Sequence, residues 1–154
     1  MSTGAIRADI DRVEAAIGTA AVDATARADA TAGQFYDLSI PIDLALVVGN
    51  ADIVTDVILG HKFQIVAASF LVTEAIVLNG GSTVTLQLDV EATPVTGGVI
   101  ILAAASARGV WAAGTAITAG NAVSATQKIS VRSESVTAHT SGKGILILRL
   151  KSVA

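Results

Sequence analysis

Two different periodicities divide the chain. Over residues 4–30 apolar positions recur at spacings of three and four, in the series Ile6, Ile10, Val13, Ile17, Ala20 and Ala24. This spacing predicts an amphipathic helix with a single apolar stripe. From about residue 35 the pattern changes to alternation and to short apolar runs bounded by Gly, Asn and Pro, which is typical of strands and turns. We therefore expect an N-terminal helix or arm at residues 1–33 and a β domain at residues 34–154.

The clearest strand pattern spans residues 82–92, where Val84, Leu86, Leu88 and Val90 alternate with polar side chains. Pro41 indicates an edge or a bulge, and turns are expected at 49–50, 79–81, 120–121 and 139–144. About eight strands at this spacing predict an antiparallel sandwich or barrel. The predicted strands are 35–41, 43–48, 52–59, 62–78 with a bend near Ala67 and Ala68, 82–92, 99–106, 123–138 as one strand or a pair, and 145–153.

The predicted helix has three possible roles. Isoleucine at both seam positions favours three or more strands in a coiled coil, so Ile6, Ile10, Val13 and Ile17 are candidates for a trimer or partner interface. The same stripe is also compatible with a helix that packs on its own β domain, because tertiary packing supplies most helix stability. An arm docked on a partner protein is the third reading.

The composition favours burial against other protein. Apolar residues make up 52% and charged residues 15% of the chain, against about 45–50% and about 25% in ordinary domains. A membrane-spanning helix needs about 20 consecutive apolar residues, and the longest run here is 99–105. Five aromatic residues are too few for the girdles of a membrane barrel. We expect no membrane insertion and a large surface buried against copies of the chain or a partner.

Several function classes are disfavoured by residue content. There is no cysteine, which excludes disulfides and thiolate metal sites. A net charge of −3 without a basic cluster argues against direct nucleic-acid binding. The polar start of the chain does not resemble a secretory signal.

No catalytic or metal-binding constellation is predicted. His61 and His139 fall in predicted turns beside glycine, where histidines are usually exposed polar residues. The pairs Asp52 and Asp56, and Asp89 and Glu91, fit solvated strand faces better than acid–base pairs. The sequence SGKG at 141–144 lacks phosphate-loop spacing and is expected to be a hairpin turn. We expect neither an enzyme nor a bound cofactor or metal.

The segment ARGVW at 107–111 brings Arg108 close to Trp111, the one tryptophan of the chain. Arginine and tryptophan are enriched as interface anchors. The segment is therefore either an interface loop, in a trimer or on a partner, or a packed loop with one solvent-facing guanidinium.

Taken in order, several segments resemble a known family. They are the helical front, HKFQIVAASFLVTEA, EATPVTGG before an apolar strand, GTAITAGNAVSATQ, and the C-terminal SGKGILILRLKSV. This pattern, over about residues 35–154, resembles the capsid cement (head decoration) proteins of tailed bacteriophages, including those of short-tailed cyanophages. The resemblance implies a jelly-roll-like β-sandwich that forms homotrimers on the capsid exterior, bridges major capsid protein subunits and stabilises the head. Assembly in the host cytoplasm is expected, and the family offers no catalytic residues to carry over.

Two other functions compete with this interpretation. The alternative is a trimeric head fibre or spike tip that binds a host glycan or receptor, although loops of Ala, Gly and Thr lack the exposed aromatics usual there. A small hydrolase would need a polar constellation that the sequence does not display.

Overall fold

The structure is a computed structural model that describes residues 33–46, 51–78, 83–134 and 139–153. Internal contacts group the chain into Met1–Gln34 with Ala154, and Phe35–Val153. The predicted helix at 4–30 and its stripe of Ile6, Ile10, Val13 and Ile17 lie outside the described residues. The second unit, Phe35–Val153, is described below.

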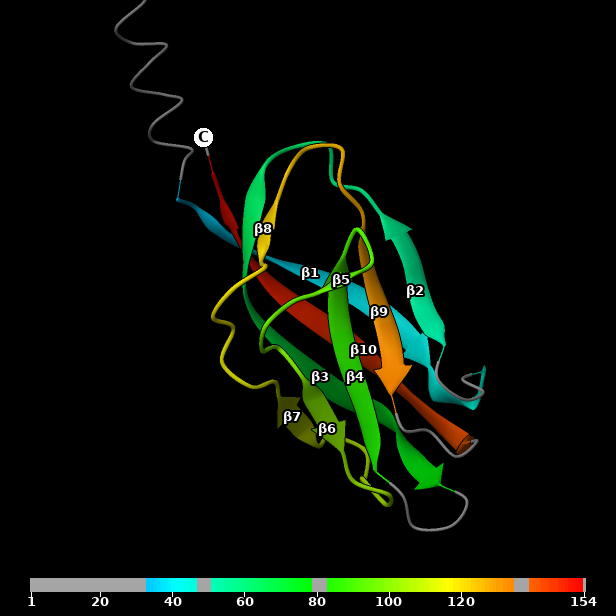
Figure 1. The fold of residues 1–154 in the computed structure, drawn as a ribbon. Helices are drawn as coiled ribbons and strands as arrows, with labels where there is room; N and C mark the ends of the chain where they lie inside the picture. The colour runs from blue at the N-terminus through cyan, green and yellow to red at the C-terminus, as the bar shows by residue number, and fades with distance from the viewer. Residues whose placement is uncertain (1–32, 47–50, 79–82, 135–138, 154) are drawn as a thin grey trace, which may run out of the picture. The chain divides into compact units, whose positions relative to one another are not determined.

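Ten strands in two antiparallel sheets make up the described part of this unit (Figure 1). Sheet A has the order β1-β10-β3-β7, with β8 also paired to β3. Its strands are β1 (Phe35–Asp43), β3 (Phe63–Leu78), β7 (Trp111–Ala113), β8 (Ala122–Val123) and β10 (His139–Ser152). Sheet B has the order β2-β9-β4-β5, with β6 also paired to β4. Its strands are β2 (Asp52–Val57), β4 (Val84–Val90), β5 (Thr93–Pro94), β6 (Ile100–Leu102) and β9 (Ile129–Glu134). The all-β prediction is confirmed, with ten strands among the described residues where about eight were expected.

The strand pairs are nested along the chain. The first strand, β1, pairs with the last, β10, and β2 pairs with β9. Further inward, β3 pairs with β7 and β8, and β4 pairs with β5 and β6. Two further pairs, β10 with β3 and β9 with β4, complete the sheets.

One hydrophobic core lies between the two sheets, because each long strand turns alternate side chains inward. The predicted inward row of β4, Val84, Leu86, Leu88 and Val90, is at most 6% exposed. Opposite it, sheet A contributes fully buried side chains from β3 and β10. The largest of these are Phe63, Ile65, Phe70, Ile76, Leu146 and Leu148.

Pro41 and the bend in the 62–78 strand are placed as predicted. Pro41 lies on β1, an edge strand of sheet A, where the missing N–H costs no ladder bond. Between β3 and β10 the register shifts after the pair Ala67↔Arg149, and the next pair is Ile65↔Leu150. One extra residue, Val66, is therefore bulged out of β3 next to the predicted bend.

Two local predictions were wrong. Residues 43–48 were expected to form a strand, but Leu44–Leu46 form a 3-10 turn. The Asp43 carboxylate accepts a hydrogen bond from the Ala45 N–H at 3.0 Å, a local bond that competes with strand pairing. Residues 139–144 were expected to form a hairpin turn, but they are the first part of β10.

The glycines of residues 139–144 serve packing instead of a turn. A Cβ on Gly144 would lie 2.1 Å from a ring carbon of Phe70. Glycine in a strand interior is used where another group approaches the backbone closely. Gly144 thus makes room for Phe70, the large core side chain of the neighbouring strand.

Candidate functional site

One side of the domain carries almost no charge. Between Glu91 and Lys128 the single charged residue is Arg108. We call residues 92–127 the neutral side; they form β5 and β6 of sheet B, then β7 and β8 of sheet A. Ordinary protein surfaces carry mixed charges, and charged residues are depleted at the centre of interfaces.

Backbone hydrogen bonds hold the loops of the neutral side together. The Gly98 N–H donates to the Thr115 carbonyl at 2.9 Å, and the Thr115 N–H donates to the Val99 carbonyl at 3.0 Å. A Cβ on Gly97, whose φ is +89°, would lie 1.9 Å from the Ala116 carbonyl oxygen. These loops therefore have a backbone held by hydrogen bonds, and they connect the edge strands of both sheets.

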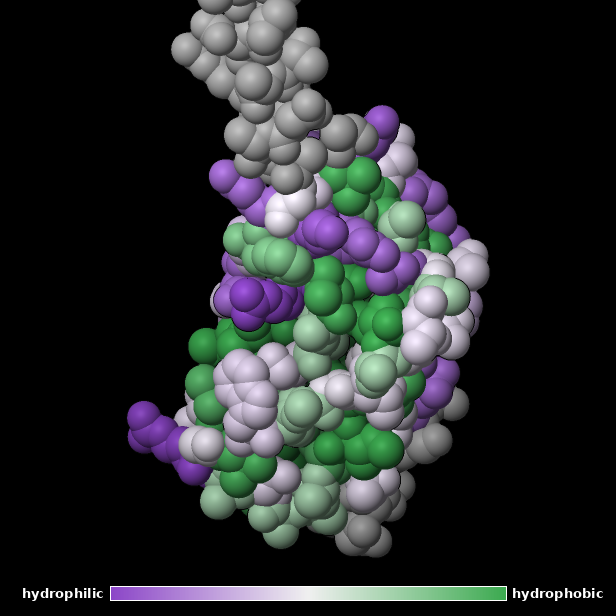
Figure 2. Space-filling view, turned by 90° about the vertical axis from the view of Figure 1, so that its left-hand side faces the viewer, coloured by the Kyte–Doolittle hydropathy of each residue, from purple (hydrophilic) through white to green (hydrophobic). Residues whose placement is uncertain are grey.

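Large apolar side chains are exposed on the neutral side. Ile101 is 58%, Trp111 55% and Val110 39% exposed. Figure 2 faces the side that lies on the left in Figure 1, and green and pale residues prevail over its lower part. Exposed apolar groups that form a contiguous patch mark interaction surfaces in soluble proteins.

The candidates Arg108 and Trp111 are both exposed on this side. Ile101 and Val110 were missed by the sequence reasoning. The signal that would have pointed to them is the run of residues 92–127 with one charge.

A groove of about 350 Å³ continues from Trp111 across the outer face of sheet A. Strand register places Ser39, Ile147, Ser69 and Ala113 in one row across this face. The side chains of Ser69 and Ala113 in this row are short, so they do not fill the groove. The groove is lined by Asp37, Ala67, Ala68, Ser69, Trp111, Ala113, Gly114, Ile147 and Arg149.

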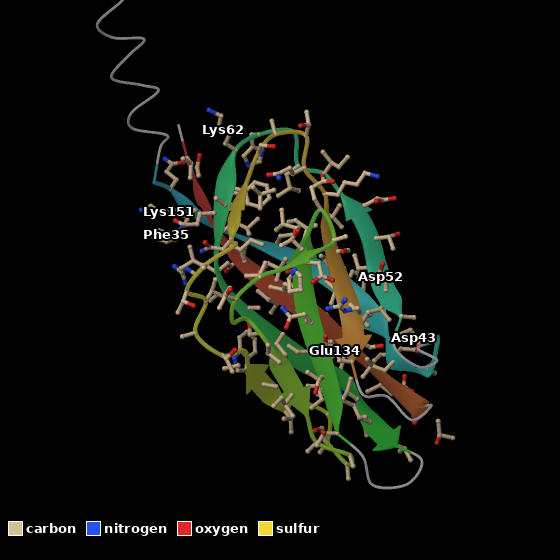
Figure 3. All side chains as sticks on the ribbon, viewed as in Figure 1. Phe35, Asp43, Asp52, Lys62, Glu134 and Lys151 are labelled. Atoms are coloured by element: carbon tan, nitrogen blue, oxygen red, sulfur yellow. The ribbon has the colours of Figure 1, made fainter. Side chains whose placement is uncertain are left out.

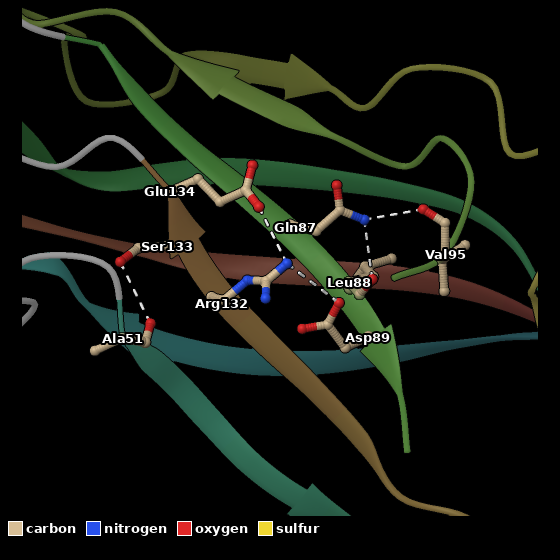
Figure 4. A network of polar contacts seen from close by, with 8 residues as sticks. All are labelled: Ala51, Gln87, Leu88, Asp89, Val95, Arg132, Ser133 and Glu134. Atoms are coloured by element: carbon tan, nitrogen blue, oxygen red, sulfur yellow. Dashed lines mark hydrogen bonds and ion pairs between the residues drawn. The ribbon is translucent and has the colours of Figure 1, made fainter. Parts of the chain in front are cut away.

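The expectation of a solvated face for Asp89 was wrong. Gln87 and Asp89 project from β4 away from the core, yet they are only 7% and 3% exposed. The Gln87 side-chain amide donates to the carbonyls of Leu88 and Val95 at 3.0 and 2.9 Å (Figure 4). Gln87 is held by the chain that returns after β5, and Asp89 lies against Arg132 of β9. Alternation within one strand does not reveal these contacts.

Asp89 belongs to a cross-strand charge network with β9. The Arg132 guanidinium lies 3.7 Å from the Asp89 carboxylate and 3.0 Å from that of Glu134 (Figure 4). Burial raises the pKa of Asp89 above its ordinary value; Arg132 opposes this, and the carboxylates of Asp52 and Glu134 add to it. The network ties β4 to β9.

The other acidic pair lies in an open hollow. Asp52, Asp56 and Glu91 are exposed and line a hollow of about 350 Å³ together with Lys128. The Lys128 ammonium lies 3.0 Å from the Asp56 carboxylate, and this hydrogen bond raises the pKa of Lys128. Within the described ranges, no group of three or more His, Cys, Asp or Glu side chains is arranged to hold a metal ion.

His61 is exposed, as expected, but it has partners. Its Nε2 shares a hydrogen bond with the Tyr36 hydroxyl, and its Nδ1 lies 3.0 Å from the Leu59 carbonyl oxygen. The ring also lies 5.7 Å from that of Phe63, centroid to centroid. This fixes His61 at the end of sheet A. His139 lies at the start of β10, not in the predicted turn.

Comparison with known proteins gives no relative. No protein-family model matches the sequence, and no curated protein or solved structure matches it significantly. Among the described residues, no helix is long and apolar enough to cross a membrane.

Proposed function

We propose that this chain is a structural virion protein, a homotrimeric cement protein bound to the outside of a phage capsid. In this function the β domain forms the trimer, and the neutral side contacts the major capsid protein. The observation that carries the proposal is the neutral side, an apolar surface of fixed backbone with exposed Ile101, Val110 and Trp111.

We also propose a jelly roll as the fold of the β domain. A jelly roll is a double-sheet fold built from two Greek keys, in which a long antiparallel ribbon is wound so that its outermost strands pair. The nested pairs β1 with β10 and β2 with β9, followed inward by β3 and β4 with β5–β8, support this assignment. Phage cement proteins of the family that the sequence resembles use this fold.

The mechanism needs no chemistry. A contact made by one subunit is weak, but a trimer that engages three coat subunits gains through effective concentration, by about 10²–10⁴ over the single contact. A trimer seated at a junction of coat subunits would resist their separation under the pressure of packaged DNA. The predicted N-terminal helix would add contacts to the shell or between subunits.

Two measurements test the proposal. Sedimentation equilibrium of the full chain should give the mass of three chains, and the protein should co-sediment with decoration-free heads of a short-tailed cyanophage. A monomer at every concentration together with no head binding would refute the proposed function. Deleting residues 1–33 should weaken head binding; unchanged affinity would remove the N-terminal region from the mechanism.

A trimeric fibre or spike tip remains the competing function. A glycan array separates the two, because a receptor-binding tip should bind specific glycans and leave the heads unbound. The cement function predicts the reverse result.

A further inference from the structure

Unpaired cations surround an exposed aromatic ring at one end of sheet A. Phe35 is 53% exposed, and the Arg149 guanidinium and Lys151 ammonium lie 5.3 and 5.9 Å from its ring centroid. Lys62 lies on the same side (Figure 3). Among the described residues, none of these three cations has a carboxylate within 4.0 Å. One acidic residue lies next to these cations: Asp37 on β1 is paired with Arg149 on β10. We call Phe35, Lys62, Arg149 and Lys151 the cationic end.

Carboxylates gather on the opposite side of the domain. Figure 3 places Asp43, Asp52 and Glu134 on the far side from Lys62, Lys151 and Phe35. Three cations lie among them, and each is engaged: Arg132 with Glu134 and Asp89, Lys143 with Glu74 at 3.1 Å, and Lys128, in the hollow with Asp52, with Asp56 at 3.0 Å. The exposed or half-buried carboxylates on this side therefore outnumber the cations, and Asp52 has no basic partner within 4.0 Å among the described residues. These carboxylates are Asp43, Asp52, Asp56, Glu74, Glu91 and Glu134. We call this group the acidic end.

We infer that the cationic end of one subunit binds the acidic end of a second copy of this chain. The inference rests on the proposed trimer and names the surfaces that form it. Opposite charges on opposite sides of one domain make a heterologous, head-to-tail contact complementary, and such contacts close into a ring when the rotation allows it. Exposed Phe35 supplies an apolar anchor at the centre of the cationic end, where a partner would desolvate the ring and its two cations together.

A head-to-tail arrangement also explains why the charges stay unpaired within one chain. Contacts between like ends are repulsive, so the charges disfavour any pairing of two cationic ends or of two acidic ends.

Charge reversal tests the inference in the full-length protein. The cation variant is Arg149→Glu with Lys151→Glu, the acid variant is Asp52→Lys with Glu134→Gln, and the control is Arg108→Glu on the neutral side. Each is checked by circular dichroism and thermal melting, and its mass is measured by sedimentation equilibrium between 50 mM and 500 mM NaCl. Because the changed side chains are exposed or half-buried, the domain should fold in each case.

The expected result is a wild-type and control trimer that weakens as salt rises, and a self-association about tenfold or more weaker in each charge variant. An equimolar mixture of the two variants should regain association as mixed oligomers, since the reversed ends are again complementary. A wild-type trimer that both variants leave intact would overturn the inference while the proposed function stands. A cation variant that stays trimeric but no longer binds heads would also overturn the inference, because the cationic end would then contact the coat protein and not a second copy of the chain. A monomeric wild type would overturn the proposed trimer and the inference together.

Discussion

Replacing Trp111 by Thr should weaken head binding strongly and lower the stability of the domain by a comparable free energy. A tryptophan side chain buries about 150–250 Å² when fully covered, and 55% of Trp111 is exposed in the single chain. Covering the exposed part therefore removes about 80–140 Å² from water, which at about 25 cal/mol per Å² gives about 2–3.5 kcal/mol per contact. The expected loss of affinity is about 30–300-fold per contact. Threonine is chosen because it keeps a strand-favouring residue on β7.

The assay is an adsorption isotherm of the full chain on decoration-free heads, with urea unfolding as the parallel measurement. The covered part of Trp111, about 70–110 Å², contacts its own domain. By the same conversion the substitution should also cost about 1.5–3 kcal/mol of unfolding free energy. Ile58→Thr is the matched control, because Ile58 is 49% exposed and lies outside the neutral side. Head binding by Trp111→Thr within twofold of the control would refute the assignment of the neutral side as the shell contact.

Three further predictions concern the domain itself. Ala92 lies at φ +62° in a two-residue turn between β4 and β5, so Ala92→Gly should stabilise the domain by about 0.5–1 kcal/mol in urea titrations, and a destabilised variant would contradict this. Gly97→Ala should destabilise it by about 2–3 kcal/mol, because the new Cβ overlaps the Ala116 carbonyl; an unchanged melting temperature would show that these loops yield easily. Burial raises the pKa of Asp89, so the folded state binds the Asp89 proton more tightly than the unfolded state does. At any pH above the folded-state pKa, the ionised carboxylate therefore lowers the free energy of unfolding. Asp89→Asn should therefore raise the unfolding free energy at pH 7 and remove the gain that the wild type shows as pH falls through that pKa; a loss of stability at pH 7 would instead assign Asp89 a net favourable pairing with Arg132.

The strands with strict alternation were predictable because burial follows a period of two. β4 is the clearest case: four inward residues are buried, as their spacing predicts. Pro41 was also predictable, since a residue without an N–H is tolerated at an edge. In both cases the deciding physics lies within the segment itself.

The missed features depend on contacts between distant segments. Gly144 reads as a turn residue by local rules, but it is a strand glycine because Phe70, far away in sequence, needs its space. Asp89 reads as solvent-exposed by alternation, but it is buried, with Arg132 of the neighbouring strand β9 against it. The cationic and acidic ends are likewise invisible along the chain, since Phe35 and Lys151 are brought together only by the pairing of β1 with β10.

The neutral side and the trimer depend on each other energetically. Apart from Ile101, Val110 and Trp111, the neutral side presents mostly Ala, Gly and Thr, and side chains this small bury little apolar area each. A flat surface of this kind also loses binding free energy to the freedom that association removes. One subunit alone would therefore bind a coat protein weakly. When three such surfaces are fixed in one ring, the translational and rotational freedom of the ring is lost only once for all three contacts. The head-to-tail contact between the charged ends would therefore allow a weakly binding neutral side to hold firmly to a shell.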